Sequence, residues 1–228
     1  MDVREFFSQW DIYRLCIEHN TLHHREVEEC LRAEFRHRHT PFRFLDLASG
    51  DATITARALA PAPVASYTAV DFSAPALALA GGNTAVLDCP REFLNEEFTD
   101  FLRTRGGIFD VIYLGLSLHH LSREDKREAM VHLHRLLAPD GVFCMFEPIL
   151  HGGESRDECL ARWHRHMDGP YDAFPAAARE AVWDHVRTFD HPESLDEYFD
   201  SARAAGFADG AVLFQDQGNF YALMRFTR

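Results

Sequence analysis

The chain has 228 residues, 46% of them hydrophobic, and a formal net charge of −13 at pH 7. Its length suits one large α/β domain, or one domain with a small cap. The negative charge argues against a nucleic-acid-binding surface, because phosphate neutralisation needs clustered lysines and arginines. No run approaches the roughly 20 apolar residues that span a bilayer, so no membrane association is expected.

The cysteines indicate whether the protein belongs to a reducing or an oxidising cellular compartment. Five of them are widely spaced, and none forms a C-x-x-C pair. Residues 1–5 contain no apolar export core. These features are typical of reduced thiols, so we expect a cytoplasmic protein. We further expect this protein to be a monomer or a homodimer.

The first part of the chain is expected to be helical. Residues 3–37 have apolar residues at helical spacing, with a break at Asn20 and Thr21. Thr21 is the expected N-cap of the second helix. Because this segment precedes the first predicted strand, residues 1–40 are predicted to form an N-terminal helical cap.

The middle of the chain alternates strands with helices. Predicted strands run into Asp46, over residues 67–70 and 85–88, from residue 109, and over 142–146. Predicted helices cover residues 52–60, 74–81, 90–103 and 123–138, with Ser73 and Ser122 as N-caps. This alternation predicts a mainly parallel sheet with helices on both faces, formed by residues 41–148.

The pattern changes after residue 148. Residues 149–192 contain no convincing strand but two amphipathic helices, about 154–167 and 175–188. We interpret them as a helical insertion that forms a lid over the strand ends. A last helix, 192–205, ends at Gly206, and strands 211–215 and 220–225 follow, so residues 193–228 would complete the core.

The stretch from Asp46 to Ala52 is the most informative. Its strand, tight turn and helix bring backbone N–H groups close to a ligand. The second strand ends in Asp71, whose carboxylate can accept from both hydroxyls of a ribose. The turn lacks the G-x-G-x-x-G of a dinucleotide site, and the chain has no phosphate-binding loop. The Asp46 carboxylate would repel a phosphate and suits a ligand that carries an ammonium group and a sulfonium.

These features resemble the class I S-adenosylmethionine-dependent methyltransferases, whose first motif reads acidic-x-G-x-G-x-G. Only Gly50 is kept here; Ala48 and Ala52 replace the other glycines, and alanine can form such a turn if φ stays negative. The resemblance implies an α/β fold with a seven-stranded, mostly parallel, doubly wound Rossmann-like sheet and an antiparallel C-terminal hairpin. It also implies S-adenosylmethionine (SAM) as cofactor and S-adenosylhomocysteine (SAH) as product.

The resemblance assigns residues to the cofactor. Asp71 matches the ribose-binding acid and Phe72 would lie beside the adenine. Asp88, after the predicted third strand, matches the acid that accepts from the adenine amino group, with Leu87 and Cys89 flanking the ring. The full predicted cofactor set is Asp46, Ala48, Ser49, Gly50, Asp71, Phe72, Asp88, Cys89, Leu114 and Leu116.

Candidate catalytic residues lie at the exits of the fourth and fifth strands, where ligands of open α/β sheets bind. They are His119, His120 and Glu147. A histidine here could hold or deprotonate a substrate, or one of the pair could simply pack under the next helix. The [D/N]-P-P-[Y/F] signature of amide and nucleobase methylation is missing. Oxygen, carboxylate, amine, imidazole, sulfur and carbon acceptors stay open.

Cations and aromatics in the two added segments are candidates for substrate binding. They are Trp10, Tyr13, His19, Arg162, Trp163, His166 and Tyr171. An ordinary amphipathic helix with Trp163 and Met167 facing the core would equally explain part of this set. The 14 histidines include no H-E-x-x-H and no C-x-x-C partner, so no metal is predicted.

The sequence therefore predicts an enzyme that transfers a methyl group from SAM to a small-molecule acceptor. Two alternatives stay open. The degenerate glycines would also suit a catalytically inactive SAM-binding partner protein. A tRNA or protein methyltransferase is the other alternative, which the acidic balance disfavours.

Overall fold

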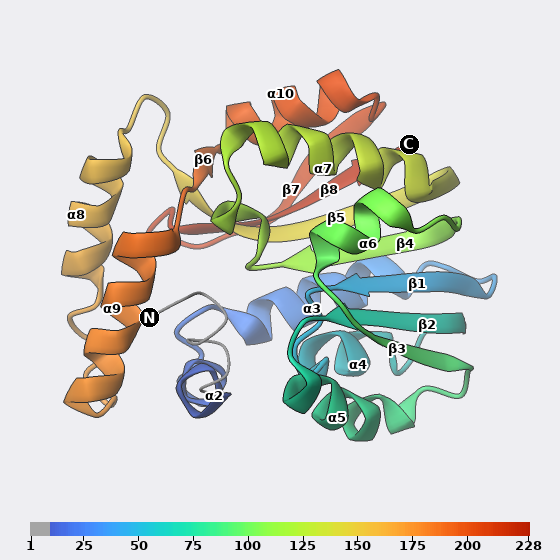
Figure 1. The fold of residues 1–228 in the computed structure, drawn as a ribbon, viewed down its shortest axis with the longest axis horizontal. Helices are drawn as coiled ribbons and strands as arrows, with labels where there is room; N and C mark the ends of the chain where they lie inside the picture. Colours follow the sequence, from blue (N-terminus) through green and yellow to red (C-terminus); the bar gives the residue numbers. More distant parts are fainter. Residues whose placement is uncertain (1–9) are drawn as a thin grey trace.

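The computed structural model describes residues 10–228 and contains one twisted mixed sheet with helices on both faces (Figure 1). Its strands are β1 (Phe42–Leu47), β2 (Val64–Asp71), β3 (Arg91–Asn95), β4 (Phe109–Gly115), β5 (Leu137–Leu150), β6 (Glu193–Ser194), β7 (Asp209–Gln215) and β8 (Tyr221–Thr227). The order is β3-β2-β1-β4-β5-β8-β7, and the short β6 pairs with β5. Strands β1 to β5 are parallel and β8 runs antiparallel to β5 and β7, so the predicted fold is confirmed.

Most helices lie close to the ranges that the apolar periodicity and the capping residues predict. They are α2 (Trp10–His19), α3 (His24–Phe35), α4 (Thr53–Leu59), α5 (Ala74–Asn83), α6 (Phe98–Thr104), α7 (Arg123–Leu136), α8 (Arg156–His166), α9 (Ala176–Phe189) and α10 (Leu195–Ala205), with 3-10 turns η1 (Thr84–Val86) and η2 (Leu118–His120). The hydroxyls of Ser73 and Ser122 accept from the backbone of the first helical turn, as predicted. Gly206 ends α10 with φ 103°, a conformation that glycine adopts without strain.

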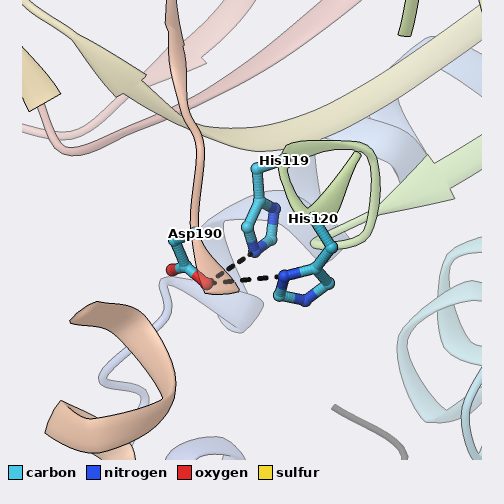
Figure 2. Close-up of side chains that lie close together, drawn as sticks. All are labelled: His119, His120 and Asp190. Carbon is cyan, nitrogen blue, oxygen red and sulfur yellow. Dashed lines mark ion pairs between the residues drawn. The ribbon is translucent and has the colours of Figure 1, made fainter. Parts of the chain in front are cut away.

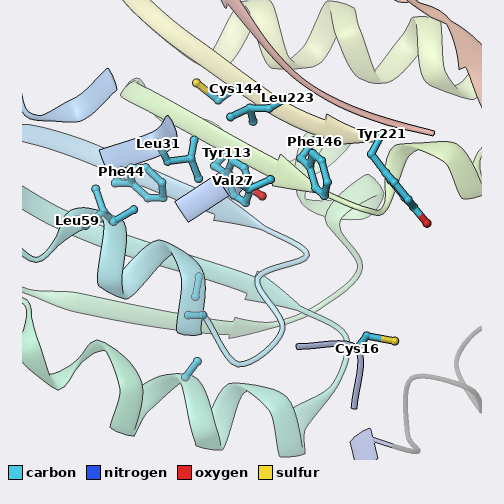
Figure 3. Packing of buried hydrophobic residues seen from close by; sticks show 14 of the residues in the cluster. Cys16, Val27, Leu31, Phe44, Leu59, Tyr113, Cys144, Phe146, Tyr221 and Leu223 are labelled. Atoms are coloured by element: carbon cyan, nitrogen blue, oxygen red, sulfur yellow. The ribbon is translucent and has the colours of Figure 1, made fainter. Parts of the chain in front are cut away.

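Two hydrophobic layers cover the two faces of the sheet. Because side chains alternate along a strand, Phe44 of β1 joins one layer and Leu45 joins the other. The first layer packs α3, α4 and α5 against the sheet, and Figure 3 shows part of it around Phe44, Leu31 and Tyr113. The second layer packs α6, α7 and α10 on the opposite face.

Helices α2, α8 and α9 stand beyond one end of the sheet rather than on a face (Figure 1). Only part of the predicted N-terminal cap lies there, because α3 packs beside α4 and buries Val27, Leu31 and Phe35 in the core. The two helices of residues 149–192 form as predicted, and β5 and β6 tie both ends of that segment to the sheet.

Three local predictions are wrong. Residues 85–88 form no strand; they belong to η1 and the loop after it, and the third strand is Arg91–Asn95. The predicted helix over 90–103 is therefore this strand followed by α6. His23, with φ 55°, and not Thr21, is the N-cap of α3.

Two further findings complete the description. No helix of residues 10–228 is long and apolar enough to cross a membrane. All five cysteines lie in the described part of the chain, and all of them are free thiols.

Candidate functional site

A cavity of about 310 Å³ lies between the carboxyl ends of the parallel strands and helices α2, α8 and α9. We call one part of its wall the loop side: residues 46, 48–55, 71–73, 76 and 97–99, which belong to the β1–α4, β2–α5 and β3–α6 connections and the helix starts. The rest is the histidine side, which comprises Tyr13, Cys16, Ile17, Leu22, His24, Tyr113, residues 115–117 and 119–121, Phe146, Pro148, Trp163, Tyr171, Val182, His185, Val186, Asp190 and Tyr221.

The turn after β1 lies on the loop side and has an unusual backbone. Ala48, Gly50 and Ala52 have φ of 49°, 54° and 55°, so the expectation of negative φ at the alanines is wrong. Left-handed φ costs an alanine about 1–2 kcal/mol, and such strain concentrates at functional sites. The turn persists because Ser49 N–H donates to the carbonyl of Val70 at 3.1 Å and Asn83 binds the carbonyl of Asp51 at 2.9 Å.

Asp71, at the end of β2, joins the two loops of this side. One carboxylate oxygen accepts from Gly50 N–H at 2.8 Å and the other from Ser73 N–H at 2.7 Å. Burial raises the pKa of Asp71, while these backbone bonds oppose the shift. Each oxygen keeps a further lone pair, so the carboxylate can still accept from two donors of a ligand.

Asp46, at the end of β1, is almost fully buried beneath the turn. Its carboxylate accepts from Thr55 Oγ1 at 2.6 Å and from the Tyr67 hydroxyl at 2.5 Å. Burial raises the pKa of Asp46 to about 7, and these two hydrogen bonds only partly offset the shift. An uncompensated carboxylate in this position would be stabilised by a cationic ligand.

Three predicted cofactor residues do not line the cavity. Asp88 is exposed and Cys89 half-buried in the loop after η1, because the third strand begins later than expected. Leu114 points into the second hydrophobic layer on the far face of β4. Ala48, Ser49, Gly50, Phe72 and Leu116, in contrast, do line the cavity together with Asp46 and Asp71.

The exit of β3 supplies residues that the sequence did not reveal. Glu97, Phe98 and Thr99 line the loop side instead of Asp88. The β3 strand lies at the edge of the sheet, with three of its five residues exposed and two half-buried, so its apolar signal is weak. The apolar pair Phe93-Leu94 was the one signal that could have located it.

Glu147, predicted as catalytic, does not line the cavity but lies behind its wall. It is 0% exposed and accepts from the backbone N–H groups of Ser117, Leu118 and His119, at 2.9–3.1 Å. One oxygen also lies 2.6 Å from Nδ1 of His119. Burial raises the pKa of Glu147 to about 7. Glu147 therefore holds η2 and orients the His119 ring, and it is a positioning residue.

His119 and His120 both line the cavity. Nδ1 of His119 is engaged by the Glu147 carboxylate, so Nε2 is the ring nitrogen that is turned towards Asp190. The two rings are in contact, with centroids 4.0 Å apart, and His185 of α9 packs against His120 at 5.0 Å. Burial lowers the pKa of all three imidazoles.

Asp190, which caps the C-terminus of α9, meets these histidines and was not foreseen. Figure 2 shows one oxygen of its carboxylate facing both His119 and His120. The Oδ1 atom lies 3.6 Å from His119 Nε2, 3.5 Å from His120 Nδ1 and 3.7 Å from His185 Nε2. Burial raises the pKa of Asp190. A sequence pattern could not reveal this group, because helices α7, α8 and α9 and strand β5 separate Asp190 from the histidines along the chain.

Only some of the predicted substrate-binding residues line the cavity. Tyr13, Trp163 and Tyr171 line the cavity, whereas His19, Arg162 and His166 do not. Arg162 is paired with Glu154 at 2.8 Å and lies over the Phe220 ring, on which His166 also stacks. The side chain of Trp10 lies outside the described residues.

Comparison with known proteins is consistent with this architecture. Residues 45–143 match the family model of the methyltransferase domain. A search of curated protein sequences finds no match.

Several solved structures share the fold. The plantazolicin methyltransferase BpumL, in complex with a monoazolic desmethylPZN analog and SAH, has a TM-score of 0.69 at 13% identity, over 97% of this chain and 90% of that one. An O-methyltransferase family protein from Burkholderia thailandensis has a TM-score of 0.63 at 19% identity, over 89% and 56%. Human N-acetylserotonin methyltransferase in complex with SAM has 0.55 at 15%, over 82% and 48%.

The chain thus spans little more than half of the Burkholderia protein's length. Residues 45–143 thus match the methyltransferase-domain family, and the chain shares the Rossmann-like fold of SAM-dependent methyltransferases.

Proposed function

We propose that the protein is an enzyme that transfers a methyl group from SAM to a small molecule held on the histidine side of the cavity. The main support for this proposal is the cavity. Strand-end loops of the kind found in methyltransferases form one side of it, and an aromatic wall that carries histidines forms the other. When bound, SAM supplies a methyl group on a positively charged sulfur.

The residues of the loop side suit this cofactor. The free lone pairs of Asp71 can accept from the two ribose hydroxyls, and Phe98 and Phe72 offer apolar surface for the adenine. The buried Asp46 carboxylate favours the cationic end of the ligand, because a positive charge offsets the cost of burying it.

The histidine side suits a small acceptor that is largely apolar. Val182, Val186, Trp163 and Tyr171 of the insertion and Ile17 of α2 provide mostly aliphatic and aromatic surface. The imidazoles of His119 and His120 offer polar contacts for the acceptor's nucleophilic group. We propose that α2 and the insertion act as a lid, which excludes water and orients the acceptor towards the loop side.

The same proposal includes a cytoplasmic location and a monomer or homodimer. Five free cysteines support a reducing compartment. Neither the net charge of −13 nor the apolar lining favours a nucleic-acid acceptor.

SAH release over a panel of small aromatic and aliphatic acceptors tests this function. The Val186→Trp variant fills the histidine side and should abolish turnover while SAH affinity, measured by calorimetry, changes little. Val131→Trp is the matched control, because Val131 lies on α7 with 53% exposure and outside the cavity. Full turnover in Val186→Trp would place the acceptor elsewhere, and no SAH binding at all would remove the proposal.

A further inference from the structure

We propose that His119, His120 and Asp190 form a binding site for one divalent transition-metal ion on the histidine side of the cavity. The three side chains each offer one ligand atom, and these atoms all lie within 4.8 Å of one another. Figure 2 shows them converging from two segments, η2 and the end of α9.

The distances suit ligands of a common ion better than a direct contact. Asp190 Oδ1 is 3.6 Å from His119 Nε2 and 3.5 Å from His120 Nδ1. These separations are too long for good hydrogen bonds. Two ligands that each lie about 2.0–2.1 Å from a zinc ion are about 3–3.5 Å apart, so a small inward shift would complete the site.

The orientation of the His119 ring also suits a metal ligand. Its Nδ1 lies 2.6 Å from a Glu147 carboxylate oxygen, which leaves Nε2 as the ring nitrogen that faces the Asp190 carboxylate. A carboxylate that orients a histidine from behind is also the usual arrangement at metal-binding histidines.

The ligands are held in place by several bonds. Arg156 Nε donates to the Asp190 carbonyl at 2.7 Å, and the next residue, His191, donates its N–H to the His119 carbonyl at 2.8 Å. Lys126 binds the carbonyl of His191. Asp190 is thereby fixed beside η2, so binding an ion requires little ordering.

The local charge also favours a cation. Glu147 and Asp190 are both buried beside the histidines. The buried ammonium group of Lys126 lies 3.9 Å from a different carboxylate, Glu193. A divalent ion would offset the two buried carboxylates, and imidazole with carboxylate is a ligand set that suits zinc, cobalt or nickel.

The role of such an ion in methyl transfer rests on the proposed function, whereas its binding does not. All three ligands line the cavity, so the remaining coordination positions would be open to the acceptor. An oxygen or nitrogen donor of the acceptor could bind there and lose its proton more readily. The sequence predicted no metal because the histidines form no H-E-x-x-H motif and have no C-x-x-C partner, and Asp190 lies far from His119 and His120 along the chain.

Metal titration of the full chain tests the site. After removal of bound metal with a chelator, Co²⁺ should bind with one ion per chain and give visible absorption bands, and Zn²⁺ should displace it. Asp190→Asn should weaken Co²⁺ binding by about 100-fold or more, because changes behind the ligands already cost about 10–100-fold. His120→Ala provides a second variant, and thermal unfolding checks that both fold.

The matched control is His151→Ala, because His151 is exposed and lies outside the ligand group. It should bind Co²⁺ as the unmodified chain does. Absence of Co²⁺ and Zn²⁺ binding in the unmodified chain, or equal binding in Asp190→Asn, would overturn the site. SAH calorimetry on the same samples separates the two proposals: SAH binding without metal binding removes only the ion site, and metal binding without SAH binding removes only the methyltransferase.

Discussion

The two sides of the cavity are built in different ways. On the loop side, backbone groups of the turn after β1 and the start of α5 are held by one carboxylate, Asp71. On the histidine side, η2 and the end of α9 meet only through tertiary contacts, which Glu147 and the His119–His191 bond maintain. Substitutions on the loop side should therefore act mainly on the cofactor, and those on the histidine side on stability and on the acceptor.

Glu147→Gln should have the largest effect. Glutamine keeps one acceptor oxygen and puts an NH₂ group in place of the other, so two of the four nitrogen partners of Glu147 lose their acceptor. Unsatisfied buried donors cost about 1–3 kcal/mol each, so we expect a loss of about 2–6 kcal/mol in unfolding free energy by urea denaturation.

Glu29→Gln is the control, because Glu29 is exposed on α3, and it should change stability by less than about 0.5 kcal/mol. SAH affinity of the folded Glu147→Gln protein should stay close to that of the unmodified chain. An equal loss of SAH affinity would mean that the two sides do not act separately.

Asp71→Ala tests the loop side. It removes charged hydrogen bonds, worth roughly 1.5–3 kcal/mol each, so SAH affinity should fall by about 10- to 100-fold in calorimetry. Asp88→Ala should leave the affinity unchanged, because Asp88 is exposed and outside the cavity. If Asp88→Ala weakened binding and Asp71→Ala did not, the assignment of the loop side would be wrong.

Asp46 should make stability depend on pH. The pKa of its carboxyl is about 3.8 in the unfolded chain and about 7 in the folded protein, chiefly because of burial. Between these values the folded state binds more protons, so the stability of the ligand-free protein falls as the pH rises. The Asp46→Asn variant has no carboxyl group at this position, so it lacks this contribution to the pH dependence of stability.

The melting temperature of Asp46→Asn relative to the unmodified chain should therefore increase from about pH 5 to about pH 8. Asp88→Asn is the control for the exchange of a carboxylate for an amide, because Asp88 is exposed and lies outside the cavity. A constant difference across this range would mean that Asp46 does not titrate in the folded protein between these values.

The smallest effect should come from the strained alanines. Ala48→Gly and Ala52→Gly remove a cost of about 1–2 kcal/mol for left-handed φ but add about 0.4–1 kcal/mol of unfolded-state entropy. Each should stabilise the protein by up to about 1 kcal/mol. Ala177→Gly, at an exposed position on α9, should instead destabilise it by about 0.5–1 kcal/mol. The same sign in all three would argue against strain in the turn.

Short sequence patterns predicted much of the fold. A few neighbouring residues were enough to predict the strand-turn-helix at Asp46, the N-caps Ser73 and Ser122 and the helix end at Gly206. The structure contains all of these features. Prediction failed at β3, because an edge strand with partly buried residues has little apolar pattern.

The loop-side acids Asp46 and Asp71 could be located from the sequence because a parallel sheet gathers its strand ends at one edge, and strand ends can be read locally. Whether a side chain reaches the cavity is a different matter. Glu147 and Leu114 both lie near strand exits, yet one lies behind the wall and the other faces the opposite layer. Only the tertiary structure brings Asp190 to His119 and His120, because that contact depends on where α8 and α9 lie beyond the strand ends and not on spacing along the chain.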